Sequence, residues 1–158
     1  MRLTSLAIPA AIPAAVLATM IATPLLAQTA EDSAVKARQG FYTAISIEMN
    51  TLAGMARGEI DYDEAAASAA ASNLMALASY DAPKLFIEGT STDEIETTNA
   101  LPAIWQDNDD FRAKFAALTQ ATSGIDQAVM GGQGNVGPVV QQLGLACRDC
   151  HQSYRRDR

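Results

Sequence analysis

Beyond about residue 30, apolar residues recur at every third or fourth position, and polar residues fill the positions between them. This spacing places one apolar stripe along an α-helix. Alanine is abundant and β-branched runs are few, which favours helix over strand. The pattern therefore predicts an all-α chain with four helical segments.

The first two segments have recognisable ends. The first, over about 33–57, stops at Gly58 and has its apolar face at Val35, Phe41 or Tyr42, Ile45, Met49, Leu52 and Met55. Asp61 and Glu64 resemble a capping box, in which side chains satisfy the free backbone N–H groups of a helix start. We expect the second helix to begin there and to end before Pro83, with Leu74, Leu77 and Ala78 facing inward.

The stretch 81–106 separates these helices from the next pair. It contains Pro83, Gly89 and Pro102 among threonine, serine and acidic residues, so we expect a long crossing loop with one helical turn at most. A third helix should start at the cap Asp107 and continue to the glycine-rich turn at 131–137. The fourth should open at Pro138 and run into the cysteines near the end of the chain.

The N-terminal residues have the features of an export signal. Arg2 precedes an apolar run with small residues near its end, LTSLAIPAAIPAAVLATMIATPLLA. The prolines in this run argue against a permanent membrane helix. We expect a cleaved signal peptide over 1–27, with cleavage as late as 30 as the alternative. The mature domain, over 31–158, is then expected in the periplasm without a membrane anchor.

The chain is acidic, with a formal net charge of −7 at pH 7. Removal of 1–27 would take away only one basic side chain, that of Arg2. An acidic surface repels phosphate backbones, so we expect no nucleic-acid partner.

Both cysteines and the only histidine stand together near the C-terminus, as Cys147, Cys150 and His151. On a helix these positions are i, i+3 and i+4, so the three side chains emerge from nearly one face. Cys-x-x-Cys-His is the attachment signature of c-type haem, in which the thiols form thioethers and the imidazole binds the iron. The motif predicts one covalent haem c per chain, with His151 as the metal ligand.

Three other uses of these residues are open on the sequence. A disulfide between Cys147 and Cys150 would close a tight loop across one helical turn. A thioredoxin-like pair needs a preceding strand, and structural zinc usually needs four cysteine or histidine ligands, of which this chain has fewer. We favour haem because the export signal and the lack of competing cysteines agree with it as well.

The single histidine limits the coordination of the iron. With His151 on one side, the sixth position is taken by methionine, by a weaker ligand, or by no protein group. The methionines after the signal are Met49, Met55, Met75 and Met130, and helical packing alone would explain each of them.

Several motifs together make the chain resemble the class II cytochromes c, and most closely cytochrome c′. They are VKARQ at 35–39, ARGEIDYDEAAA at 56–67, ALPAIWQD at 100–107 and CRDCHQSYR at 147–155. The resemblance covers essentially the whole mature chain. It implies an antiparallel up-down-up-down four-helix bundle with covalently bound haem near the C-terminus, and homodimers formed through the first two helices. The loop at 84–100 departs from the shorter, glycine-rich stretch of many members.

The resemblance also implies roles for four residues outside the haem-attachment motif. In the family, the residue four after the first-helix arginine faces the vacant side of the haem, and low-spin members have methionine there. This chain has Tyr42, four after Arg38, which implies five-coordinate, high-spin iron with the Tyr42 ring shielding the open face. Arg38 and Gln39 would contact a haem propionate, and Arg155 would lie near the proximal side of the iron.

These features predict a haem protein that binds NO and CO and that also passes electrons to an unknown redox partner. We expect no enzyme activity, because no acid–base pair is placed to act on a substrate. An apolar open face favours NO, which binds haem iron strongly without a polar donor. The alternative is a six-coordinate electron-transfer cytochrome with Met49 or another methionine as sixth ligand. A third hypothesis, without haem, is a small helical interaction protein with a disulfide.

Overall fold

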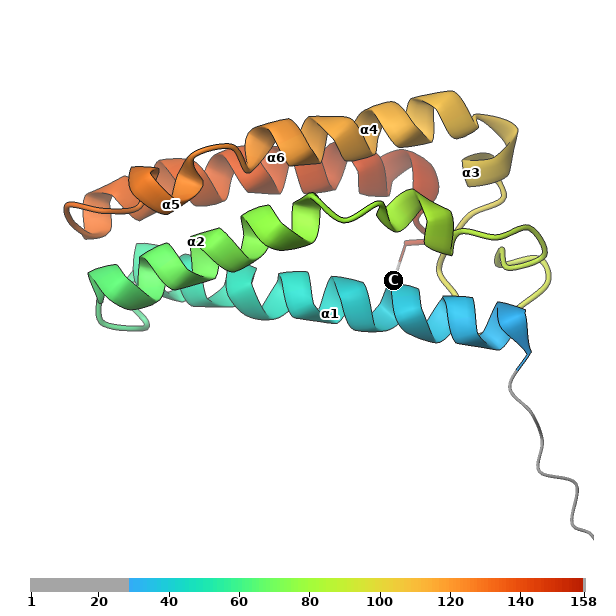
Figure 1. The fold of residues 1–158 in the computed structure, drawn as a ribbon, viewed down its shortest axis with the longest axis horizontal. Coiled ribbons are helices and arrows are strands. Elements are labelled where there is room, and N and C mark those ends of the chain that lie inside the picture. The colour runs from blue at the N-terminus through green and yellow to red at the C-terminus, as the bar shows by residue number, and fades with distance from the viewer. Residues whose placement is uncertain (1–28, 158) are drawn as a thin grey trace, which may run out of the picture.

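The computed structural model describes residues 29–157, which form helices joined by turns, with one isolated bridge between Ala100 and Arg155. The four main helices are α1 (Ala30–Arg57), α2 (Glu64–Ala78), α4 (Asn108–Ala121) and α6 (Val136–Tyr154). Four short elements lie between them, η1 (Ala82–Leu85), α3 (Ala103–Gln106), α5 (Ile125–Ala128) and η2 (Gln133–Asn135). The long helices pack side by side in alternating directions (Figure 1). The predicted all-α four-helix bundle is confirmed.

The expected signal peptide, 1–27, lies outside the described residues. Within 29–157, no helix is both long and apolar enough to cross a membrane.

Helix α1 is defined at both ends by its own sequence. The Thr29 side chain accepts a hydrogen bond from the Asp32 backbone N–H at 3.1 Å, so the helix starts three residues earlier than predicted. Gly58 ends it with a φ of 72°, and its N–H donates to the carbonyls of Gly54 and Met55. Glycine adopts this left-handed conformation without the steric cost that a Cβ would bring.

The predicted capping box of Asp61 and Glu64 is wrong. The cap of α2 is Asp63, whose Oδ1 accepts from the Ala66 backbone N–H at 2.7 Å. Glu64 instead accepts a hydrogen bond from the backbone N–H of Gly131 at 2.8 Å, across the far end of the bundle. The Glu64 carboxylate therefore binds a residue distant in the sequence, Gly131, and does not cap the start of α2.

The predicted third helix is also wrong as a single element. Helix α4 follows the predicted cap Asp107, which accepts from the Asp110 backbone N–H at 3.3 Å, but α4 ends at Ala121. Gly124, with a φ of 72°, breaks the helix, and α5 is a separate single turn. Helix α6 begins two residues before Pro138, which lies in the first turn, where proline displaces no helical hydrogen bond.

The crossing segment 81–106 contains two short helical turns, η1 and α3, where at most one was expected. Trp105 anchors it, because the indole N–H donates to the Phe86 carbonyl at 3.2 Å. The segment lies at the end of the bundle where α1 begins and α6 ends (Figure 1).

Buried side chains form two hydrophobic clusters. The first fills the bundle between α1, α2, α5 and α6 and includes Ile45, Leu52, Leu74, Val129 and Leu143. The second lies under the crossing segment and consists of Ala100, Ile104, Phe111 and Tyr154, with Phe86, Ala103, Trp105 and Cys150 packed against it. We call them the bundle cluster and the crossing cluster.

Candidate functional site

Helix α6 places the two cysteines by the register of its buried face. Val136, Val139 and Leu143 are buried at steps of three and four, and the same steps lead to Cys147, Cys150 and the buried Tyr154. Arg148 and Asp149, between the cysteines, are exposed. The predicted arrangement on one helical face is therefore present, and that face points into the molecule.

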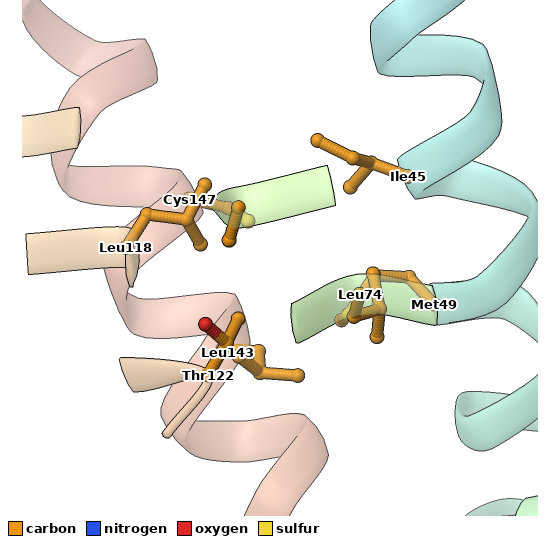
Figure 2. Close-up of a pocket in the computed structure, with 8 residues that line it drawn as sticks. Ile45, Met49, Leu74, Leu118, Thr122, Leu143 and Cys147 are labelled. Atoms are coloured by element: carbon orange, nitrogen blue, oxygen red, sulfur yellow. The ribbon is translucent and has the colours of Figure 1, made fainter. Parts of the chain in front are cut away.

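Cys147 faces the bundle cluster. It lines a small cavity of about 10 Å³ together with Ile45, Met49, Leu74, Leu143 and side chains at the end of α4. Figure 2 shows Cys147 and Leu143 on one side of this cavity and Ile45 and Met49 of α1 on the other. The surroundings are apolar, and burial raises the pKa of the Cys147 thiol.

Cys150 lies one turn further along the same face of α6, against the other hydrophobic cluster. It packs against the crossing cluster, and burial raises the pKa of its thiol to about 11, with Cys147 acting in the same direction. Both thiols are unpaired in the structure, which shows no disulfide between them. Attachment through both sulfurs would therefore connect one group to both hydrophobic clusters.

His151 is half-buried next to the cysteines. Burial lowers the pKa of its imidazole, and the charge of Arg155 lowers it further. The neutral imidazole, which has a free nitrogen lone pair, is thus the favoured form at neutral pH. Neutral imidazole is the form that binds a metal.

Arg155 is exposed, four residues after His151, and its backbone N–H donates to the His151 carbonyl at 3.1 Å. Its charge is the second influence, after burial, that lowers the pKa of the His151 imidazole. The place of Arg155 near the proximal side of the iron stays a prediction.

Tyr42 is half-buried on α1 and packs against the bundle cluster. Burial raises the pKa of its phenol above the ordinary value, Cys150 and Cys147 raise it further, and Arg38 acts in the opposite direction. The Phe41 ring packs edge-on against the Tyr42 ring at a centroid distance of 5.2 Å, which limits its motion.

Arg38 lies one helical turn before Tyr42 and is 4% exposed. Its Nη1 donates to Thr90 Oγ1 at 2.7 Å, and its Nη2 donates to the Thr90 carbonyl at 3.0 Å and to Thr98 Oγ1 at 3.1 Å. The guanidinium also lies 4.7 Å from the centre of the Phe86 ring. Burial lowers its pKa, but a guanidinium remains protonated in proteins.

All of these partners of Arg38 are neutral. Among residues 29–157, no carboxylate lies within ion-pair distance of it. A buried cation without an anionic partner carries a desolvation cost that a nearby anion would offset. Arg38 therefore marks a position suited to a negatively charged group of a ligand.

Gln39, the other residue expected near a propionate, is exposed. Its Nε2 donates to the Thr97 carbonyl at 2.9 Å. It thus binds the crossing segment beside the Arg38 contacts.

The sequence analysis missed the residues that hold Arg38. Thr90 and Thr98 lie 52 and 60 positions from it, and Phe86 is nearly as distant in sequence. Threonines in a long loop are ordinary in composition, so no local pattern indicated that two of them accept from a buried guanidinium. The departure of 84–100 from the family's shorter loop was the only signal available.

This donor set fits a covalent haem c. Two thiols one helical turn apart suit thioether formation, and a neutral imidazole beside them suits axial ligation of iron. The buried Arg38 guanidinium suits a propionate. A structural zinc site does not fit, because among the described residues no cluster of three or more histidine, cysteine or carboxylate ligands is present.

Comparison with known proteins agrees with this chemistry. A family model described as Cytochrome C′ matches residues 33–155. A cytochrome c′ of Cereibacter sphaeroides is 40% identical over 133 residues, which cover 84% of this chain and 89% of that protein. A cytochrome c-554 of the same organism is 38% identical over 135 residues, which cover 84% and 88% of the two chains.

Solved structures give the same result. A cytochrome c′ structure from Rhodobacter Spheriodes superimposes with a TM-score of 0.77 at 40% identity and covers 81% of this chain and 98% of that chain. A nitric oxide complex of a mutant cytochrome c prime from Alcaligenes xylosoxidans superimposes with a TM-score of 0.69 at 25% identity, covering 81% and 97% of the two chains.

Proposed function

The chain belongs to the cytochrome c′ family, whose members carry covalently bound haem c, and we propose that it binds small gases such as NO and CO at a five-coordinate, high-spin iron. Haem c supplies an iron that binds diatomic gases and changes oxidation state by one electron. Cys147 and Cys150 would hold the group through thioethers, and His151 would ligate the iron.

The position of Tyr42 carries the proposal of an open sixth site. Its side chain packs against the bundle cluster, four residues after Arg38, at the position where the family resemblance puts methionine in low-spin members. Burial keeps its phenol protonated, and a neutral phenol is a poor iron ligand. With no second histidine in the chain, the Tyr42 ring shields the open face without closing it by coordination.

Ligand selection follows from the same face. The Arg38 guanidinium on the same face is already bonded to Thr90 and Thr98, so bound O₂ would find little stabilisation beyond the Tyr42 hydroxyl, whereas NO binds haem iron strongly without a polar donor. The nitric oxide complex of a mutant of the related Alcaligenes protein supports NO binding by analogy. Binding of NO would protect the cell from it, and electron transfer to an unknown redox partner is a second role for the same iron.

Three further features belong to the proposal. We infer export to the periplasm from the signal-like N-terminus, and a homodimer through α1 and α2 from the family resemblance. We also infer that the protein is not an enzyme, because the site contains no acid–base pair placed to act on a substrate.

A six-coordinate electron-transfer cytochrome is the alternative. One observation favours it, because Met49 lines the same small cavity as Cys147. Met49 lies seven residues beyond Tyr42, however, which is about 10 Å along the helix axis. That separation is large for two residues that would share one iron position.

The absorption spectrum of the exported protein, ferric and then dithionite-reduced, tests the proposal directly. Broad, poorly split reduced bands are expected for five-coordinate, high-spin iron. Sharp, well-resolved α and β bands would show a sixth protein ligand and would contradict the proposal. Loss of those sharp bands in Met49→Ala would then establish the methionine alternative.

A further inference from the structure

Residues 97–101 of the crossing segment, which we call the strap, hydrogen-bond to both α1 and the end of α6. These two helices carry the groups proposed to lie on opposite sides of the iron, Tyr42 and His151. The strap is therefore the part of the chain that can set the spacing between the two sides.

The α1 side of the strap is held by two neighbouring residues. Nη2 of Arg38 donates to Thr98 Oγ1 at 3.1 Å, and Nε2 of Gln39 donates to the Thr97 carbonyl at 2.9 Å. Because Arg38 is buried and charged, its N–H groups need acceptors, and loss of one leaves a donor unsatisfied.

The α6 side is held by residues that follow His151. The Leu101 backbone N–H donates to the Tyr154 carbonyl at 3.0 Å, and the Arg156 backbone N–H donates to the Asn99 carbonyl at 2.9 Å. Nη2 of Arg156 donates to the Thr98 carbonyl at 3.2 Å. Arg155, between these anchors, forms the bridge with Ala100.

Thr98 belongs to both sides. It is 4% exposed, its hydroxyl oxygen accepts from Arg38 and from the Ala100 backbone N–H at 3.2 Å, and its carbonyl accepts from Arg156. One buried residue thus connects the helix of Tyr42 to the chain just beyond His151.

We propose that Thr98 is a positioning residue, which holds the Tyr42 face of α1 at a set distance from the His151 end of α6 and so controls ligand entry. The inference rests on the proposed function. Arg38 and Tyr42 lie one helical turn apart on the same face of α1, so the hydrogen bonds that hold Arg38 also hold the backbone that carries the Tyr42 ring. When Arg38 loses its acceptor on Thr98, the ring covers the iron less tightly and ligands enter faster.

The test uses the exported, haem-loaded protein and three variants. Thr98→Val removes the hydroxyl at nearly constant volume. Thr98→Ser keeps the hydroxyl and is the conservative rescue. Thr97→Val is the matched control. The Thr97 side chain is exposed, and Thr97 accepts the hydrogen bond from Gln39 through its backbone carbonyl, which the substitution keeps. Hydrogen exchange of the Leu101 and Arg156 amides and CO association with the reduced protein are measured for all four proteins.

In Thr98→Val we expect amide exchange to accelerate about tenfold or more, because a hydrogen bond to a charged group is lost. CO association should accelerate roughly three- to tenfold, since covering groups that move more freely admit ligands faster. Thr98→Ser and Thr97→Val should match the wild type in both measurements. Faster exchange with unchanged CO association would show a purely structural role and would overturn the proposal, as would unchanged exchange.

If Thr98→Val fails to fold or to retain haem, Arg156→Gln provides the second test. Arg156 is exposed, so its loss leaves no buried charge without an acceptor. We expect faster exchange at Leu101 and a smaller rise in CO association, and wild-type values for both would overturn the proposal. Failure of the proposed function would instead appear in the wild-type spectrum alone, whereas failure of the Thr98 role appears only in the comparison of variants.

Discussion

At the scale of residues, the site depends on Arg38 and Tyr42 of α1. Burial is the main cause of the pKa shift of each side chain. Arg38 is a buried cation among neutral partners, a setting that an anionic group such as a propionate would suit. Tyr42, one turn later, is half-buried, and burial keeps its phenol neutral. Under the proposed function, Arg38 would anchor the haem edge and Tyr42 would cover the iron.

Removal of the Tyr42 ring should open the sixth position. In Tyr42→Ala we expect the association rate of CO with the reduced protein to rise about tenfold or more, which corresponds to roughly 1.4 kcal/mol of barrier. Stopped-flow or flash-photolysis measurements give this rate. Thr43→Ala, at the next position but exposed, should leave it unchanged. An unchanged rate in Tyr42→Ala would show that the ring does not cover the iron.

The protonation of Tyr42 gives a pH prediction. Burial raises the pKa of this phenol, so the proton is retained up to about pH 10, where an ordinary tyrosine is half ionised. Ferric absorption spectra of the wild type and Tyr42→Phe should therefore change in the same way between about pH 6 and pH 10. A spectral transition in this range that the wild type shows and Tyr42→Phe lacks would indicate phenolate ligation of the iron.

At the scale of elements, local sequence spacing explains the inward face of a helix better than it explains the residue at which a helix starts. The inward face of α6 follows a regular spacing from Val136 to Tyr154, and the cysteines occupy that spacing. The start of α2 is different, because three acidic residues compete for one role. Asp63 caps the helix, while Glu64 binds the Gly131 N–H in the turn before α6.

Substitution of these acids distinguishes the two possible caps. Asp63→Ala should lower the free energy of unfolding by about 1 kcal/mol, because the first turn of α2 loses its side-chain acceptor. Asp61→Ala, the control, should change it by less than about 0.5 kcal/mol, as is usual for an exposed site. Urea denaturation of the haem-loaded protein measures both values. The opposite order would restore the capping box of Asp61 and Glu64.

At the scale of the whole molecule, the attachment motif lies where the two hydrophobic clusters approach each other. Cys147 faces the bundle cluster, and Cys150 packs against the crossing cluster. A group bonded to both sulfurs would therefore contribute to the packing of the bundle and of the segment that crosses its end. Haem attachment should stabilise the entire fold and not the site alone.

Replacement of the two cysteines tests whether the attached haem stabilises the entire fold. The double variant Cys147→Ser, Cys150→Ser should be exported without covalent haem, and its Tm should fall by roughly 10 °C or more relative to the loaded protein. Differential scanning calorimetry gives the midpoint. Ser153→Ala, on the exposed face of the same helix, should retain the wild-type value. An equal Tm for the double variant and the loaded protein would show that the haem adds nothing to the fold.

The sequence by itself determined the features that depend on residues close together in the chain. Periodicity predicted the helical class and the inward face of α1, and Gly58 marked its end. The spacing of Cys147, Cys150 and His151 predicted the attachment site without knowledge of the fold, because one helical turn brings them to one face.

Only the tertiary structure decided which polar groups meet across the bundle. The break at Gly124, the transfer of Glu64 to Gly131, and the burial of Arg38 against Thr90 and Thr98 are contacts or conformations that local pattern does not specify. The physical reason is that a hydrogen bond stabilises by pairing a donor with whichever acceptor the packed helices bring near it, at any distance along the chain.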